Sequence, residues 1–339
     1  MKIVIAPDSF KESLSALAVA QEIAAGFRTI YPDAEYCLLP MADGGEGTVQ
    51  ALIDASGGRR IEVTVTGPLG TPVCAFYGLM GDGECAVIEM AAASGLELVP
   101  PGQREVLRAS TYGTGQLIRA ALDAGARRFI LGVGGSATND GGAGMLQALG
   151  AALLDGSGQP LAPGGAALIA LQRFDLAGLD ARLAGCQFEI ACDVDNPLLG
   201  PQGASAIFGP QKGASAEQVQ QLDASLRHYA SVIERQLGQQ IGEVPGAGAG
   251  GGIAAAMLVF LRGRLRPGVE IVAEAVGLEA AIASADLVLT GEGRIDGQTV
   301  HGKTPIGVAR LAQRHGKPVI ALGGCLGTQV EAVYAHGIA

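Results

Sequence analysis

The chain has 339 residues, of which 48% are hydrophobic and 17% charged, and this composition excludes bulk disorder and favours two well-buried domains. A net charge of −10, 4% aromatic residues and no tryptophan argue against nucleic acid as a partner. Six cysteines without a C-x-x-C pair are expected to be reduced thiols of a cytoplasmic protein. We expect neither a signal peptide nor a membrane span, because residues 1–2 lead directly into a strand and every apolar run is too short for a bilayer.

The N-terminal part of the chain predicts alternating strands and helices. Strands are expected at 2–6 and 37–41, and helices at 48–55 and at 13–27, where Ser13 would be the N-cap. The next runs alternate apolar and polar residues between Gly-Pro and Gly-Asp-Gly turns, which predicts antiparallel strands. These runs are 61–66, 71–79 and 85–90.

The rest of the chain predicts a long α/β middle and then a return to helix–strand alternation. The middle elements are strands 129–133 and 188–192 and helices 114–124, 142–154 and 217–237. After the glycine loop 245–252 follow helix 253–261, two more helices, strand 286–290, helix 306–314, strand 318–322 and helix 328–335. The economical arrangement is a doubly wound parallel-sheet domain from both chain ends, with strand 2–6 beside strand 286–290 and a second α/β domain inserted.

Carboxylates follow five of the strand-like runs, each in a short loop that contains glycine or lies beside it. They are Asp8, Asp43 with Glu46, Asp140, Asp193, and Glu292 with Asp296. In open α/β sheets, ligands bind at the carboxyl ends of the strands. Acidic loops built on glycine turns suit a phosphate-bearing ligand that carries a metal ion. The pattern therefore predicts an enzyme.

Residues 297–304 match the phosphate-loop pattern G-x-x-x-x-G-K-[ST]. A true phosphate loop begins where a strand ends, whereas the strand predicted here ends near Thr290, seven residues before Gly297. We interpret the match as a coincidence in a glycine-rich chain. Gly302 and Lys303, which precede the expected helix start, can still form an anion site.

Two further glycine loops are candidate ligand sites. Residues 134–144 follow a clear strand and open a helix, and their hydroxyls, amide and carboxylate favour a phosphate or a small hydroxy acid over a simple Asx-type turn. Residues 246–251 match G-x-G-x-x-G, but a poor strand precedes them, so a dinucleotide site is not expected. This second loop either binds a ligand or only lets a helix approach the backbone closely. Of the four histidines, only His301 lies inside a glycine loop.

Seven motifs in order along almost the whole chain resemble the bacterial glycerate kinases of type I, which phosphorylate D-glycerate. They are A-P-D-S-F-K-E-S-L-S-A (6–16), A-D-G-G-E-G-T (42–48), G-G-S-A-T-N-D-G-G (134–142), C-D-V-D-N-P-L (192–198), F-G-P-Q-K-G-A (208–214), P-G-A-G-A-G-G-G (245–252) and G-E-G-R-I-D followed by Q-T and G-K (291–303). The family's architecture, a Rossmann-like domain with a second α/β domain inserted, agrees with the arrangement expected above. We place the first domain at residues 1–66 and 265–339 and the inserted domain at residues 67–264, with the active site in the cleft between them.

The resemblance also implies a kinase that uses ATP and Mg²⁺ to phosphorylate the 2-hydroxyl of D-glycerate. Asp193 is the first choice for the catalytic base, with Asp8 or Asp43 next, and Lys11 and Arg294 would hold the substrate carboxylate or the developing phosphoryl charge. Expected substrate-binding residues are Ser9, Asp43, Ser136, Asn139, Asp140 and Asn196. Expected nucleotide-binding residues are Gly248, Gly250, Gly251, Gly302 and Lys303, and expected metal ligands are Glu292, Asp296 and Asp43, with Asp8 a further candidate.

Several alternatives stay open from the sequence. They are glycerate 3-kinase activity, a related sugar-acid kinase, a phosphate-loop NTPase, an NAD-dependent oxidoreductase and a sugar-acid sensor without catalysis. The division of the acids between base and metal ligand, the nucleotide preference and the choice between monomer and homodimer are also open. Members of the family usually continue past residue 339 into another strand and terminal helices, so a truncated chain is one expectation.

Overall fold

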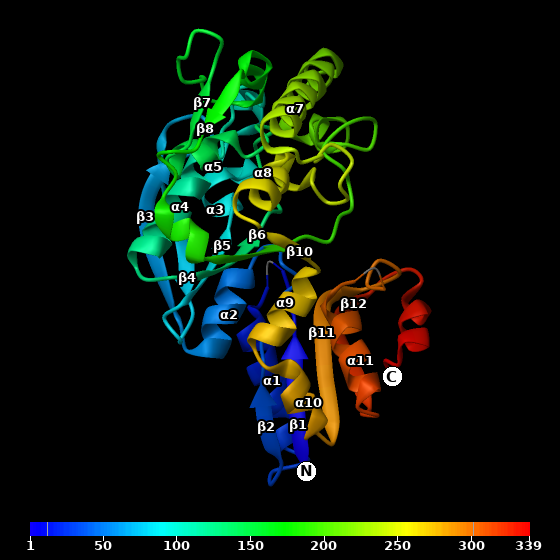
Figure 1. The fold of residues 1–339 in the computed structure, drawn as a ribbon. Helices are drawn as coiled ribbons and strands as arrows, with labels where there is room; N and C mark the ends of the chain where they lie inside the picture. Colours follow the sequence, from blue (N-terminus) through cyan, green and yellow to red (C-terminus); the bar gives the residue numbers. More distant parts are fainter. Residues whose placement is uncertain (12, 301) are drawn as a thin grey trace. The chain divides into compact units, whose positions relative to one another are not determined.

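The computed structural model describes residues 1–11, 13–300 and 302–339, which form two compact units (Figure 1). Unit 1 consists of Met1–Arg59, Met80–Asp82 and Pro267–Ala339, and unit 2 consists of Arg60–Leu79 and Gly83–Arg266. Both chain ends therefore belong to unit 1. The expected boundary after residue 66 differs from this division, because the strand that ends there joins the sheet of unit 2.

Unit 1 contains a four-stranded sheet in the order β12-β11-β1-β2, in which each neighbouring pair is parallel. The strands are β1 (Lys2–Pro7), β2 (Glu35–Leu38), β11 (Leu287–Ile295) and β12 (Val319–Leu326). The expected pairing of strand 2–6 with strand 286–290 is confirmed, with Pro7 opposite Gly291. Ile3 and Ile5 pack on helix α1 (Ala16–Arg28), while Val4 and Ala6 on the other face are equally buried. Both faces of the sheet are thus covered, as in a doubly wound fold.

The other helices of unit 1 follow the predicted order. They are α2 (Thr48–Ser56), α9 (Gly268–Ala275), α10 (Leu278–Ala283), α11 (Thr304–Arg314) and the 3₁₀ helix Val330–His336. Helix α1 begins later than expected because Ser15, not Ser13, is its N-cap and accepts a hydrogen bond from the Ala18 N–H. Strand β2 ends before Pro40, which has no N–H to donate. Strand β11 is longer than predicted because β12 accompanies it as far as Ile295.

Unit 2 contains a six-stranded mixed sheet in the order β10-β9-β6-β5-β4-β3 and a small antiparallel pair, β7 and β8. The strands are β3 (Arg59–Thr66), β4 (Pro72–Leu79), β5 (Cys85–Glu89), β6 (Arg128–Gly132), β7 (Ala152–Leu154), β8 (Arg173–Asp175), β9 (Gln187–Ala191) and β10 (Arg264–Arg266). β4 and β5 pair antiparallel, as the alternating pattern predicted, and β5, β6, β9 and β10 are parallel neighbours.

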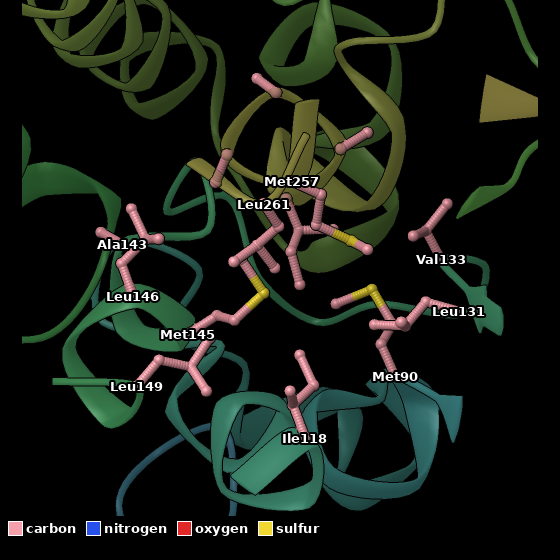
Figure 2. Close-up of a cluster of buried hydrophobic side chains, with 14 of the residues drawn as sticks. Met90, Ile118, Leu131, Val133, Ala143, Met145, Leu146, Leu149, Met257 and Leu261 are labelled. Atoms are coloured by element: carbon pink, nitrogen blue, oxygen red, sulfur yellow. The ribbon is translucent and has the colours of Figure 1, made fainter. Parts of the chain in front are cut away.

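The helices of unit 2 surround a large core. They are α3 (Ala91–Ser94), α4 (Tyr112–Asp123), α5 (Ala143–Ala148), α6 (Ala204–Phe208), α7 (Ala216–Leu237) and α8 (Ile253–Phe260), with 3₁₀ helices Leu96–Leu98, Pro101–Gln103, Gly165–Ala170, Ala181–Gly185, Pro210–Lys212 and Ala249–Gly251. Figure 2 shows Met90, Met145 and Met257 gathered in this core. The prediction of one helix over 142–154 is wrong: α5 ends before Gly150, whose φ of 101° is not helical, and the following residues form β7.

Of the helices that the structure describes, none has the length and hydropathy needed to span a membrane.

Candidate active site

Two carboxylates lie at the carboxyl ends of the central strands of unit 1. Asp8 follows β1, and its backbone N–H donates to the Gly291 carbonyl oxygen on β11 at 2.8 Å. Glu292 is the next residue on β11, so it lies in the strand and not in the loop that we expected. The pKa of Asp8 is raised to about 6, chiefly by burial and also by the charges of Asp43 and Glu292, against hydrogen bonds from Thr304 and from the Ser9 N–H. This end of the sheet therefore concentrates negative charge.

The segment after β11 returns to these carboxylates and holds both of them. Thr299 Oγ1 donates to Glu292 Oε1 at 2.6 Å, and Lys303 Nζ lies 3.2 Å from Glu292 Oε2. Thr304, the first residue of α11, donates through Oγ1 to Asp8 Oδ2 at 2.7 Å. Hydroxyls and an ammonium thus fix the directions in which the carboxylates point.

The same geometry bears on the phosphate-loop match. β11 ends at Ile295, so only Asp296 separates the strand from Gly297, and the predicted gap of seven residues is wrong. The side chains of Lys303 and Thr304 nevertheless bind carboxylates of this chain. Gly302 has a φ of 96°, a conformation that suits glycine, while His301 lies outside the described residues.

The remaining candidates of unit 1 lie around this pair. Arg294 is exposed on β11, and its Nε is 3.0 Å from Asp296 Oδ2. The pKa of Asp296 is lowered, first by a hydrogen bond from the Gln298 N–H and also by Arg294. Ser9 donates to Asp8 Oδ1 through its N–H at 2.6 Å and its hydroxyl at 3.3 Å. Lys11 is exposed.

Asp43 accepts a hydrogen bond at Oδ1 from the Gly45 N–H at 3.1 Å. Across residues 1–11, 13–300 and 302–339, no group of three or more His, Cys, Asp or Glu side chains could hold a metal ion by itself. A metal here would need further ligands from outside the protein.

In unit 2 the candidate residues lie on two adjacent loops at one edge of the sheet. β6 and β9 are parallel neighbours with Gly132 opposite Ala191, so the loops that follow them, 133–142 and 192–197, start side by side. Asp193 on the second loop is exposed to solvent. Asn196 Nδ2 donates to the Gln202 carbonyl oxygen at 2.8 Å. The fold therefore brings the expected base and the expected hydroxy-acid loop to the same sheet edge.

Asn139 and Asp140, two of the expected substrate-binding residues, are fully buried, and their contact with substrate stays a prediction. Asp140 Oδ2 accepts hydrogen bonds from the N–H and hydroxyl of Thr111 and from the Gly144 N–H, and Oδ1 accepts one from the Gly142 N–H. Burial raises the pKa of Asp140, and these hydrogen bonds oppose that shift. The contacts give Asp140 an anchoring role in its loop.

Lys212 is the main residue of this region to which the sequence assigned no role. It ends a short 3₁₀ helix and is 2% exposed, with Nζ donating to Ser136 Oγ at 2.8 Å and to the Thr138 carbonyl oxygen at 2.6 Å. Burial lowers its pKa to about 7, against the opposite effect of the Asp140 charge. The sequence Gly-Pro-Gln-Lys-Gly around Lys212 gives no indication that this lysine is buried. Its burial becomes visible only in the folded structure.

The glycine loop before α8 packs against backbone. A Cβ on Gly248 would collide with the Pro197 carbonyl oxygen, and one on Gly251 would collide with that of Thr138. Gly251 also accepts a hydrogen bond from the Gly141 N–H at 3.0 Å, and Gly250 has a φ of 62°. Two roles for this loop were open from the sequence. The close approach to neighbouring backbone explains why Gly248 and Gly251 are glycines, and contact of the loop with a nucleotide stays a prediction.

Comparisons with known proteins identify the family. Residues 3–339 match the model of the glycerate kinase family. The chain is 59% identical over 338 residues to a glycerate kinase of Bacillus subtilis, with 100% of this chain and 88% of that protein covered. The chain belongs to the glycerate kinase family. A protein named glycerate 2-kinase of Escherichia coli is 56% identical over 338 residues, which cover 100% of this chain and 89% of that one.

A solved member of the glycerate kinase family has the same fold. The crystal structure described as glycerate kinase 2 from Salmonella typhimurium superposes with a TM-score of 0.93 at 55% identity, over 99% of this chain and 94% of that one. The resemblance and the α/β fold class predicted from the sequence are thereby confirmed. As a member of this family the chain is an enzyme, a kinase, and the family implies ATP-dependent phosphoryl transfer.

Proposed function

We propose that this kinase transfers the γ-phosphoryl group of ATP to the 2-hydroxyl of D-glycerate, giving 2-phosphoglycerate and ADP in the cytoplasm. The observation that carries the proposal is the 56% identity over the full chain to a relative named glycerate 2-kinase. The 3-kinase, sugar-acid kinase, NTPase, oxidoreductase and sensor alternatives have no comparable support. The assignment of reaction and substrate therefore follows the family.

The carboxylates of unit 1 fit a magnesium ion that ATP brings with it. Mg²⁺ in kinases is bound by one or two carboxylates together with phosphate oxygens and water, so a complete protein cage is not required. Asp8 and Glu292 offer oxygen ligands on adjacent strands, and burial, together with the nearby charges of Asp43 and Glu292, raises the pKa of Asp8, so a bound cation would stabilise its ionised form. We propose these two residues, with Asp43 and Asp296 nearby, as those that would hold the metal, which neutralises phosphate charge when bound.

The substrate side of the reaction needs a proton acceptor and a cation. We propose Asp193 as the base because it is exposed at a strand end, where the 2-hydroxyl of glycerate can reach its carboxylate. Lys11 and Arg294 are exposed cations that can hold the substrate carboxylate or the transferred group. Gly302 and Lys303, at the start of α11, are proposed to contact the nucleotide phosphates.

An assay of ADP release tests this function. Purified protein with ATP and Mg²⁺ should release ADP with D-glycerate, and much less with L-glycerate or lactate, because a site that hydrogen-bonds a hydroxyl rejects analogues without it. Equal turnover of lactate would contradict the proposed substrate. ADP release without any hydroxy acid would favour the NTPase alternative, and a fluorescence signal from bound NADH would favour the oxidoreductase.

A further inference from the structure

The loop 134–140 of unit 2 is fixed at several points by buried side chains. Lys212 Nζ binds Ser136 Oγ and the Thr138 carbonyl oxygen, and Asn139 Nδ2 donates to Ser205 Oγ at 2.9 Å. The loop ends at Asp140, which accepts four hydrogen bonds from its surroundings. An irregular loop acquires a single conformation only when its polar groups are held in this way.

Polar atoms of the same loop remain without a protein partner. Thr138 Oγ1 and Asn139 Oδ1 are buried and have no hydrogen bond within the part of the chain that the structure describes. Ser136 Oγ accepts a hydrogen bond from Lys212 Nζ, so the Ser136 O–H can itself donate a hydrogen bond to an acceptor outside the chain. Buried polar groups in native proteins have partners in nearly all cases, so water or a ligand is expected to complete this loop.

A buried lysine without a directly bonded carboxylate is costly, and an apolar side chain of its size would be cheaper for folding alone. The side chains of Lys212 and Asp140 have opposite charges that act on one another through the interior. Among the described residues no ion pair joins Lys212 to Asp140, and the hydrogen bonds of Lys212 Nζ go to Ser136 and Thr138. The position of the ammonium is therefore explained by the loop that it holds.

We propose that Lys212 is a positioning residue for the kinase reaction: it holds loop 134–140 so that the Ser136 hydroxyl donates a hydrogen bond to an anionic oxygen of the hydroxy-acid substrate. Ser136 is 6% exposed and follows two exposed glycines, Gly134 and Gly135, so a ligand oxygen can approach it. A carboxylate oxygen is the matching acceptor for this hydroxyl, and the protonated form of Lys212 adds positive potential behind it. The inference rests on the proposed function for the identity of the substrate.

Kinetics of three variants test this role. Lys212→Met keeps most of the volume and removes the donor, and Ser136→Ala removes the hydroxyl. Each should raise the KM for D-glycerate about tenfold while the KM for ATP changes less than about twofold, and the double variant should be no worse than either single one. Lys317→Met, a lysine in unit 1 outside the proposed site, is the matched control. An unchanged KM for D-glycerate in Lys212→Met, or effects that multiply in the double variant, would overturn the proposal.

Two further readouts separate this role from a purely structural one. If Lys212→Met does not fold, Ser136→Ala alone must raise the KM for D-glycerate with an unchanged melting temperature, and a normal KM there overturns the proposal. Hydrogen exchange needs no activity: amides of residues 134–140 should exchange about tenfold faster in Lys212→Met than in Lys317→Met. Equal exchange would contradict the anchoring. If the wild-type protein does not phosphorylate D-glycerate, the proposed function is wrong, and the hydrogen-exchange test of the Lys212 role remains valid.

Discussion

The strand ends of unit 1 and the buried loop of unit 2 use charge in opposite ways. In unit 1, burial raises the pKa of Asp8, and the negative charges of Asp43 and Glu292 add to this effect, so that the pKa reaches about 6. In unit 2, Asp140 is surrounded by donors, and Lys212 by acceptors, of the protein itself. The first region therefore favours a cation from outside, whereas the second uses its charges to shape a loop.

The largest effect should come from Asp193, the proposed base of unit 2. Asp193→Asn keeps the shape of the side chain and removes the proton acceptor, so kcat should fall by about a hundredfold or more with little change in the KM for D-glycerate. Steady-state kinetics over a range of Mg²⁺ concentrations measures both. If the affinity for Mg²⁺ collapses instead, Asp193 is a metal ligand and the contrast between the units is wrong.

Lys212 should make the free energy of unfolding depend on pH. Its folded-state pKa of about 7 lies below its ordinary value of 10.5, so between these values the unfolded chain binds more protons there and stability rises with pH. Integrated from pH 7 to pH 9, this amounts to about 2 kcal/mol. Urea unfolding at both pH values should show wild type gaining this much relative to Lys212→Met. A constant difference between the two proteins would mean that the ammonium is not desolvated as described.

Asp8 should reveal the role of the unit 1 carboxylates. Asp8→Asn removes one negative charge and one oxygen ligand, so the concentration of Mg²⁺ needed for half-maximal activity should rise by at least about tenfold. Asp33→Asn, which changes an exposed carboxylate, is the control. Titration of activity with Mg²⁺ at fixed ATP measures the effect. An unchanged requirement would remove Asp8 from the proposed metal site.

The smallest effect is expected at Thr304. Its hydroxyl donates to Asp8, so Thr304→Ala removes one hydrogen bond and should leave activity within about tenfold of wild type, with Thr304→Ser closer still. Turnover at saturating ATP and Mg²⁺ measures this. A loss of several orders of magnitude would mean that the hydroxyl coordinates Mg²⁺ as in a phosphate loop.

Much of the fold could be predicted from sequence because its signals are local. Apolar runs that end in acids located five strands, β1, β2, β6, β9 and β11, and alternation located the antiparallel β4 and β5. The extension of β11 to Ile295 escaped prediction because it depends on pairing with β12, which is distant in sequence. The end of α5 at Ala148 was missed because one glycine, Gly150, outweighed a continuing apolar pattern.

The candidate site was harder to predict because the role of a residue depends on the side chains and backbone groups that it contacts in the folded protein. Asp8 and Glu292 could be placed together once their strands were paired. The burial of Asp140 and the contacts of Lys212 could not be foreseen, since they depend on segments that meet only in the folded unit. Residue type indicated the chemistry available at each loop, and packing decided which side chains a substrate can reach.

The position of phosphorylation tests the central claim most directly. The substrate carboxylate is one bond from C2, so a cation that grips it fixes the 2-hydroxyl more firmly than the freely rotating 3-hydroxyl. Proton-coupled phosphorus NMR of the early product distinguishes the two outcomes without any mutase present. We predict a phosphorus signal coupled to one proton, as in 2-phosphoglycerate. A signal coupled to two protons would identify the 3-phosphate and contradict the account.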